Sequence, residues 1–64
     1  MRIDVLPDAA GHWSVTHDRV LDAEFADRDS AVAYAGTCAD RARRNGREVR
    51  LEVYPPLEEV PPLK

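Results

Sequence analysis

Apolar and polar side chains alternate in three segments of residues 1–25, a pattern typical of half-buried β-strands. Residues that favour turns separate the segments, with Gly11 in the first break and Asp18 in the second. We therefore predict a three-stranded antiparallel meander with one apolar and one polar face. The inward-facing positions are predicted to be Ile3, Val5, Trp13, Val15, Leu21, Ala23 and Phe25.

The next segment has helical spacing and predicts a helix over residues 28–44. Asp27 is the expected N-cap, because its carboxylate can accept a hydrogen bond from the backbone N–H of Asp29 or Ser30. Asn45-Gly46 is typical of a helix C-terminus, where a glycine adopts the left-handed backbone conformation and ends the helix. The apolar stripe of this helix consists of Ala31, Val32, Ala35, Cys38, Ala39 and Ala42. Because most of these residues are alanine, the helix is expected to lie close to the sheet.

Residues 48–53 alternate again and predict a fourth strand, with Val49, Leu51 and Val53 facing inward. A right-handed crossover from the third strand would place it beside the first strand and parallel to it. The predicted fold is thus α+β, in the order β-β-β-α-β, with one helix packed on one face of a mostly antiparallel four-stranded sheet. The predicted core is centred on Trp13, Val15, Phe25, Val32, Ala35 and Leu51.

The C-terminal segment, residues 55–64, contains Pro-Pro-Leu twice. Proline at this density cannot continue a strand, so we expect an extended or disordered tail after a single domain over residues 1–54.

A chain of 64 residues buries only about 60% of the surface that its unfolded form exposes. Such small domains usually need a covalent cross-link, a metal or a partner for stability.

The cysteine usage and the N-terminal composition favour a cytoplasmic protein that does not enter a membrane. Cys38 is the only cysteine, so no disulfide can form within the chain. The N-terminal residues lack the apolar segment of a signal peptide, and no apolar run approaches the ~18 residues of a spanning helix. Cys38 lies on the buried stripe and no histidine is near it in sequence, so an inert thiol is expected.

The sequence offers little that predicts catalysis or cofactor binding. His12 and His17 are five residues apart and would face opposite sides of one strand, so no two-histidine metal site is expected. The carboxylates of Asp27 and Asp29 are explained by the helix start. Phosphate-binding loops, dinucleotide fingerprints and serine elbows are absent from the sequence. We expect no enzymatic activity, no cofactor and no metal.

The net charge of −3 is distributed unevenly, and five arginines fall within residues 41–50. Three of them lie in the last helical turn, where cations stabilise the helix dipole. The same arginines are the candidate contacts for a nucleic acid or another partner. They are Arg41, Arg43, Arg44, Arg47 and Arg50.

Residues in the predicted strands and helix resemble a small bacterial family catalogued as domain of unknown function 2188. The resemblance covers residues 1–54 and rests on Gly11, Trp13, Val15, Phe25, Asp27, Ala31, Val32, Ala35, Ala39, Asn45, Gly46, Val49, Leu51 and Val53. The chain departs from the family at Ser30, where the family usually has Glu, and at Pro55-Pro56, where it tends to have a glycine turn. The resemblance implies the same α+β fold and supplies no activity.

A three-stranded sheet followed by a helix also resembles the arm-type DNA-binding modules of phage integrases, which use a basic sheet face. The corresponding face here is expected to carry Asp4, Asp22, Glu24, Glu48 and Glu52 against Arg50. Such a face would repel phosphate, so binding of a nucleic acid through the sheet is not expected. Nucleic-acid binding through the five arginines remains the alternative hypothesis. The favoured hypothesis is a small protein-interaction module that forms a homodimer or docks on another protein, because unpaired strand edges are templates for pairing.

Overall fold

The computed structural model describes residues 1–56 of the chain, so most of the predicted C-terminal tail, residues 57–64, lies outside the described residues. The elements are β1 (Arg2–Pro7), β2 (Trp13–His17), β3 (Val20–Phe25), α1 (Arg28–Arg44) and β4 (Arg50–Val53). This is the predicted β-β-β-α-β order, and the bounds of α1 match the predicted helix. The fourth strand begins two residues later than expected, at Arg50.

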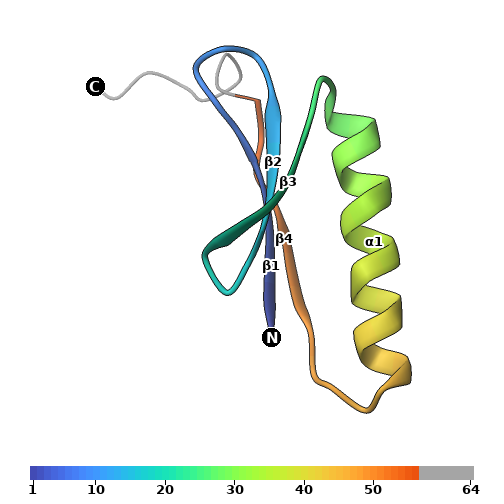
Figure 1. The fold of residues 1–64 in the computed structure, drawn as a ribbon. Helices are drawn as coiled ribbons and strands as arrows, with labels where there is room; N and C mark the ends of the chain where they lie inside the picture. The colour runs from blue at the N-terminus through green and yellow to red at the C-terminus, as the bar shows by residue number, and fades with distance from the viewer. Residues whose placement is uncertain (57–64) are drawn as a thin grey trace.

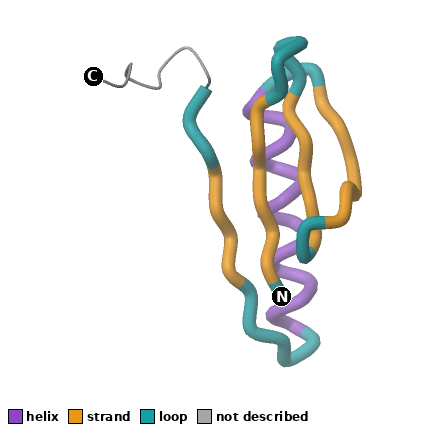
Figure 2. The backbone as a smooth tube through the Cα atoms, turned by 90° about the vertical axis from the view of Figure 1, so that its left-hand side faces the viewer, coloured by secondary structure: helices purple, strands orange, loops and turns teal. Residues whose placement is uncertain are grey.

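The strands form one sheet in the order β3-β2-β1-β4. β1 pairs with β2, and β2 with β3, in antiparallel fashion, whereas β4 lies parallel to β1. The α+β prediction and the predicted position of the last strand are therefore confirmed. α1 covers one face of the sheet, and the other face carries no helix among the described residues (Figure 1). Figure 2 shows the four strands side by side in front of this helix, with β3 and β4 at the two edges.

Both ends of α1 have the caps that the sequence predicts. The side chain of Asp27 accepts a hydrogen bond of 2.8 Å from the backbone N–H of Ser30. At the other end, Gly46 has a φ of 80°, and the N–H of Arg47 donates to the carbonyl of Ala42 over 3.0 Å. This is the Schellman arrangement, which satisfies carbonyls that the last turn leaves free. None of the helices in residues 1–56 is long and apolar enough for a membrane span.

The core lies between α1 and the sheet, where large sheet residues meet small helix residues. Ile3, Val5 and Val15 are fully buried against Ala31 and Ala35. Of the predicted core, Trp13, Val15 and Ala35 are buried, whereas Phe25, Val32 and Leu51 are partly buried and pack against these residues. Alanine at the helix positions removes bulk from the interface, which allows the helix backbone to approach the sheet.

The predicted inward position of Leu21 is wrong. A bulge in β3 shifts the register, so that Val15 pairs with Ala23 while the next residue, Thr16, pairs with Leu21. Asp22 is the extra residue of this bulge. Because paired residues on neighbouring strands share a face and Thr16 points away from the helix, Leu21 lies on the open face with 58% of its surface exposed.

The open face of the sheet differs from the wet and acidic surface that the sequence predicts. Asp4 lies in central strand β1 and is only 5% exposed. The Nε of Arg2 donates to both carboxylate oxygens of Asp4 over 3.0 Å, and its Nη2 donates to the hydroxyl of Tyr54 over 3.2 Å. These hydrogen bonds, above all the one to Asp4, raise the pKa of Arg2 above its ordinary value. The buried carboxylate is therefore held as an ion pair.

Candidate functional site

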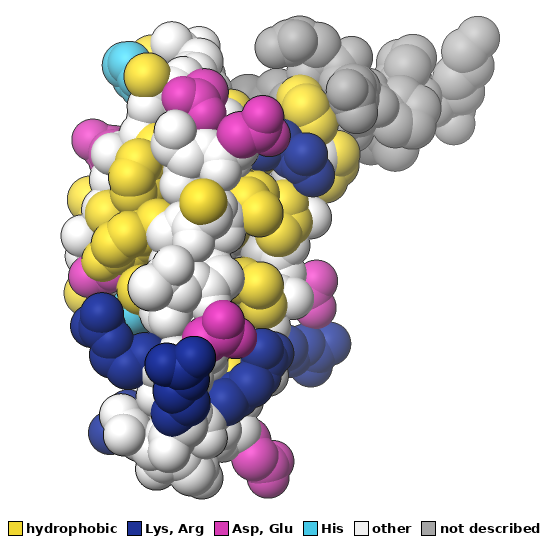
Figure 3. Space-filling model, turned by 90° about the vertical axis from the view of Figure 1, so that its right-hand side faces the viewer, with side chains coloured by type: hydrophobic (Ala, Val, Ile, Leu, Met, Phe, Trp, Pro, Cys, Tyr) yellow, Lys and Arg dark blue, Asp and Glu magenta, His cyan; other side chains and the backbone are white. Residues whose placement is uncertain are grey.

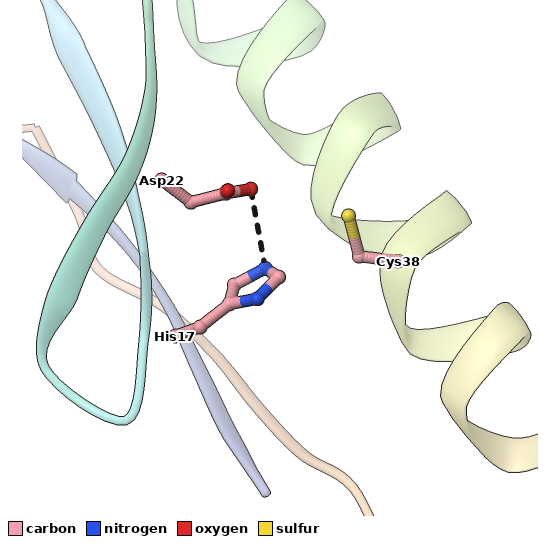
Figure 4. A group of neighbouring side chains, drawn as sticks. All are labelled: His17, Asp22 and Cys38. Carbon is pink, nitrogen blue, oxygen red and sulfur yellow. Dashed lines mark ion pairs between the residues drawn. The ribbon is translucent and has the colours of Figure 1, made fainter.

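Three side chains from different elements meet at the rim of the interface between α1 and the sheet. His17 lies at the end of β2, Asp22 in the bulge of β3, and Cys38 on α1. One potential ligand atom from each of them lies within 4.8 Å of the others. Figure 4 shows the carboxylate and the imidazole on neighbouring strands, with Cys38 on the side of the helix that faces them. We call this group the His-Asp-Cys cluster.

The bulge of β3 positions the acidic member of the cluster. In an unbulged strand Asp22 would face away from the helix, as the alternation predicts. As the bulged residue it instead reaches α1, where the hydroxyl of Tyr34 donates to its Oδ2 over 2.5 Å. This hydrogen bond, together with burial, raises the pKa of Tyr34 to about 12. The ring of Tyr34 also contacts Phe25, with 5.3 Å between the ring centroids.

The imidazole of His17 has an unsatisfied nitrogen. Its Nε2 is buried and makes no hydrogen bond in the described structure, although Asp22 Oδ2 lies 3.4 Å away. The distance allows an ion pair when His17 is protonated, but it is long for a hydrogen bond. No histidine is near Cys38 in sequence, but the fold brings His17 to it across 21 positions, so the thiol has a basic neighbour that the local sequence does not show.

A pocket of about 260 Å³ opens beside the cluster. His17 and Cys38 line it, and so do Arg41 and Arg47. The pocket gives solvent and small solutes access to the imidazole and the thiol. Two guanidinium groups at its wall attract anions, so a cation can be held beside this pocket only by ligands that supply negative charge.

The five predicted contact arginines lie near one end of the molecule, where α1 ends and β4 begins. Figure 3 shows a dense group of arginine side chains, drawn in dark blue, over this end of the helix. Arg43 lies 3.8 Å from Asp40, and Arg50 lies 3.2 Å from Glu52. The other three, Arg41, Arg44 and Arg47, are exposed and form no ion pair within residues 1–56.

The open face of the sheet, which was expected to repel nucleic acid, is less acidic than predicted. Asp22 has turned toward the helix, and Glu48 lies in the loop before β4. Asp4 is buried in its pair with Arg2, which brings a second arginine to this face beside Arg50. The expected repulsion of phosphate by this face is correspondingly smaller.

The edge strand β3 carries the most exposed large apolar side chains of residues 1–56. Val20 and Leu21 are 69% and 58% exposed. Both follow a tight turn in which Asp18 and Arg19 have φ angles of 49° and 72°. The outer edge of β3 has no neighbouring strand in the described structure.

A larger hollow of about 480 Å³ lies at the opposite end of the sheet, beside Trp13 and Arg28. Its acidic residue, Asp8, uses Oδ1 to accept from the backbone N–H groups of Ala10 and His12, both over 2.9 Å. The guanidinium of Arg28 lies 5.9 Å from the centre of the Trp13 ring. These groups stabilise the β1–β2 loop and the start of α1, so the described lining of the hollow contains no free reactive group.

Sequence reasoning missed the His-Asp-Cys cluster, although part of its signal is present in the pattern. His17 is an even number of positions from Trp13 and Val15 on β2, so its side chain points to the same face, toward the helix. Cys38 belongs to the apolar stripe of the helix, which faces the sheet. Asp22 joins them only through the bulge, which the alternation does not show.

Comparison of the chain with protein-family models, with curated proteins and with solved structures gave no match. The resemblance to domain of unknown function 2188 therefore stays a prediction.

Proposed function

We propose that this chain is a non-enzymatic protein-interaction module that pairs with a second copy of itself through the free edge of β3. The observation that carries the proposal is the exposure of Val20 and Leu21 on an unpaired edge strand. Natural proteins protect such edges with charged side chains, proline, bulges or a covering segment. β3 has a bulge at Asp22 and the charge of Glu24, but Val20 and Leu21 remain exposed beside them. The β4 edge is shorter and is followed by Pro55 and Pro56, whereas β3 has no proline near it.

The sequence of β3 suits antiparallel pairing around a two-fold axis. With the axis between Asp22 and Ala23, Leu21 of one copy faces Glu24 of the other, and Val20 faces Phe25. No two carboxylates are then directly opposite, which avoids the main electrostatic penalty of self-pairing. The contact is symmetric and closes at two copies.

Analytical ultracentrifugation tests this proposal. We expect a species of about 14.4 kDa, twice the 7.2 kDa of the chain. Leu21→Lys should shift it to the monomer, because a lysine on the edge opposes pairing. Ala33→Lys, on the exposed side of α1, is the matched control and should leave the dimer intact. A monomer at all concentrations, or a dimer unaffected by Leu21→Lys, would overturn the proposal, and a stable monomer would leave docking on a different protein.

A second candidate function is nucleic-acid binding. It is supported by three exposed arginines that form no ion pair with residues 1–56, namely Arg41, Arg44 and Arg47. Lysine and arginine contacts to phosphate release counterions, so binding should be visible at about 50 mM salt and decline steeply above it. A gel shift with duplex DNA and with RNA checks this. Loss of the shift in an Arg41→Ala/Arg44→Ala variant supports the candidate, whereas no shift at low salt eliminates it.

The proposed setting is the bacterial cytoplasm. The free thiol of Cys38 fits a reducing compartment, and the bacterial origin rests on the resemblance described above.

A further inference from the structure

We propose that His17, Asp22 and Cys38 form a binding site for Zn²⁺ or a similar divalent transition metal, with a fourth coordination position open to the adjacent pocket. This inference goes beyond the proposed function, since neither Val20 nor Leu21 belongs to the cluster. Three protein ligands with one open position are typical of zinc sites that exchange or activate a fourth ligand.

The distances between the ligand atoms of the cluster approach those of a tetrahedral zinc site. Ligands at the usual zinc distances are separated from one another by about 3.4 to 3.6 Å. His17 Nε2 and Asp22 Oδ2 are already 3.4 Å apart. Each ligand atom lies within 4.8 Å of the others, so the thiol needs to approach by about 1 Å, a shift within the reach of side-chain rotation.

The donor atoms select the metal class. Imidazole and thiolate favour Zn²⁺ and related ions, whereas Mg²⁺ and Ca²⁺ require oxygen ligands. Binding would release the Cys38 proton to solvent, which leaves a thiolate and a carboxylate on the ion. Their two negative charges neutralise the divalent ion, so the nearby guanidinium groups of Arg41 and Arg47 oppose its binding only weakly.

Two observations besides the residue types point to an ion. The buried Nε2 of His17 has no hydrogen-bond partner among residues 1–56, which costs free energy in the absence of a ligand. Asp22 is held by the hydroxyl of Tyr34, the kind of outer hydrogen bond that orients a ligating carboxylate.

A catalytic thiol is the competing interpretation of the same three residues, and the arrangement favours it less. In a nucleophilic triad the carboxylate and the thiol engage different nitrogens of the imidazole. Here the carboxylate approaches Nε2, which is also the buried nitrogen without a hydrogen bond. An ion placed among the three side chains would satisfy this nitrogen and both anions together.

Titration of the reduced, metal-free protein with Co²⁺ tests the site directly. Cobalt replaces zinc in such sites and reports a cysteine ligand through a thiolate-to-metal charge-transfer band, and tetrahedral geometry through intense visible bands. We expect both signals at one equivalent of Co²⁺ and their loss when Zn²⁺ is added. Cys38→Ser should abolish the charge-transfer band, and His17→Gln should weaken binding strongly.

Matched variants separate this site from adventitious binding and from the proposed dimer. His12→Gln removes the other histidine and should leave the spectrum unchanged. Leu21→Lys should also retain it, even where it abolishes dimerisation. Tyr34→Phe should weaken metal affinity by about 10- to 100-fold, the usual effect of losing an outer hydrogen bond. Circular dichroism of each metal-free variant checks that it is folded.

The proposal is overturned if the folded wild-type protein gives no charge-transfer band. It is equally overturned if Cys38→Ser and His17→Gln, both folded, bind Co²⁺ with the wild-type spectrum and affinity.

Discussion

The hydroxyl of Tyr34 donates a hydrogen bond to the carboxylate of Asp22 and thereby ties the middle of α1 to the bulge of β3. Both residues of this hydrogen bond make a second contact. Asp22 faces the imidazole of His17, and Tyr34 packs on Phe25 at the end of the same strand. The bulge thus determines both how the helix meets the edge strand and which side chains surround Cys38.

This contact predicts a pH dependence that Tyr34→Phe removes. Because the folded protein raises the pKa of Tyr34 from 10.0 to about 12, the neutral phenol contributes stability that is complete below pH 10. That contribution should decrease as the pH rises from 10 toward 12. Urea unfolding across this range should show a steeper loss of stability for the wild type than for Tyr34→Phe, which keeps the ring. Parallel curves would mean that the hydrogen bond does not form.

Gly36 lies in the interior of α1, and a Cβ built there meets no atom within 4 Å. A close backbone approach would be one reason for a glycine here, and residues 1–56 make none. Gly36→Ala should raise the free energy of unfolding by about 1 kcal/mol, the difference in helix propensity. Chemical denaturation measures this. A decrease in stability would show that the glycine serves a contact absent from the described residues.

Arg19 occupies the second position of the β2–β3 turn with a φ of 72°, a conformation that glycine adopts more readily. Arg19→Gly should stabilise the protein by about 1 kcal/mol, since a side chain in the left-handed region is strained. Gly46→Ala is the opposite control, because Gly46 has a φ of 80° and its substitution should destabilise the end of α1. The midpoint temperature of thermal unfolding should therefore rise for Arg19→Gly and fall for Gly46→Ala.

Ala35 is fully buried where α1 lies on the sheet. Ala35→Leu should overpack this interface and lower stability by about 1 to 3 kcal/mol. Ala33→Leu places the same side chain on the exposed side of the helix and should have little effect. If both variants unfold like the parent, the close packing of helix on sheet is wrong.

Most of the fold could be predicted because its signals are local. Alternation predicts each strand, Asp27 predicts the start of α1, and Asn45-Gly46 predicts its end. The parallel placement of β4 followed from the handedness of the crossover. Each of these signals depends on a few neighbouring residues and on physical preferences that hold in most proteins.

The errors concern β3, where a single inserted residue reverses the alternation. Leu21 and Asp22 exchange the faces that the pattern predicts, and nothing local in the sequence distinguishes a bulged strand from a regular one. The same reversal explains why the His-Asp-Cys cluster was missed. Its members come from three elements, so their proximity is a product of the tertiary fold.

The most direct test of this account is a two-dimensional NOE spectrum of the protein, because both proposals depend on the bulge at Asp22. We predict cross-peaks from the Leu21 methyl groups to Thr16, and from the Asp22 side-chain protons to Tyr34 and Cys38. Cross-peaks from the Leu21 methyl groups to Ala35 or Tyr34, with Asp22 free of contacts to α1, would contradict it.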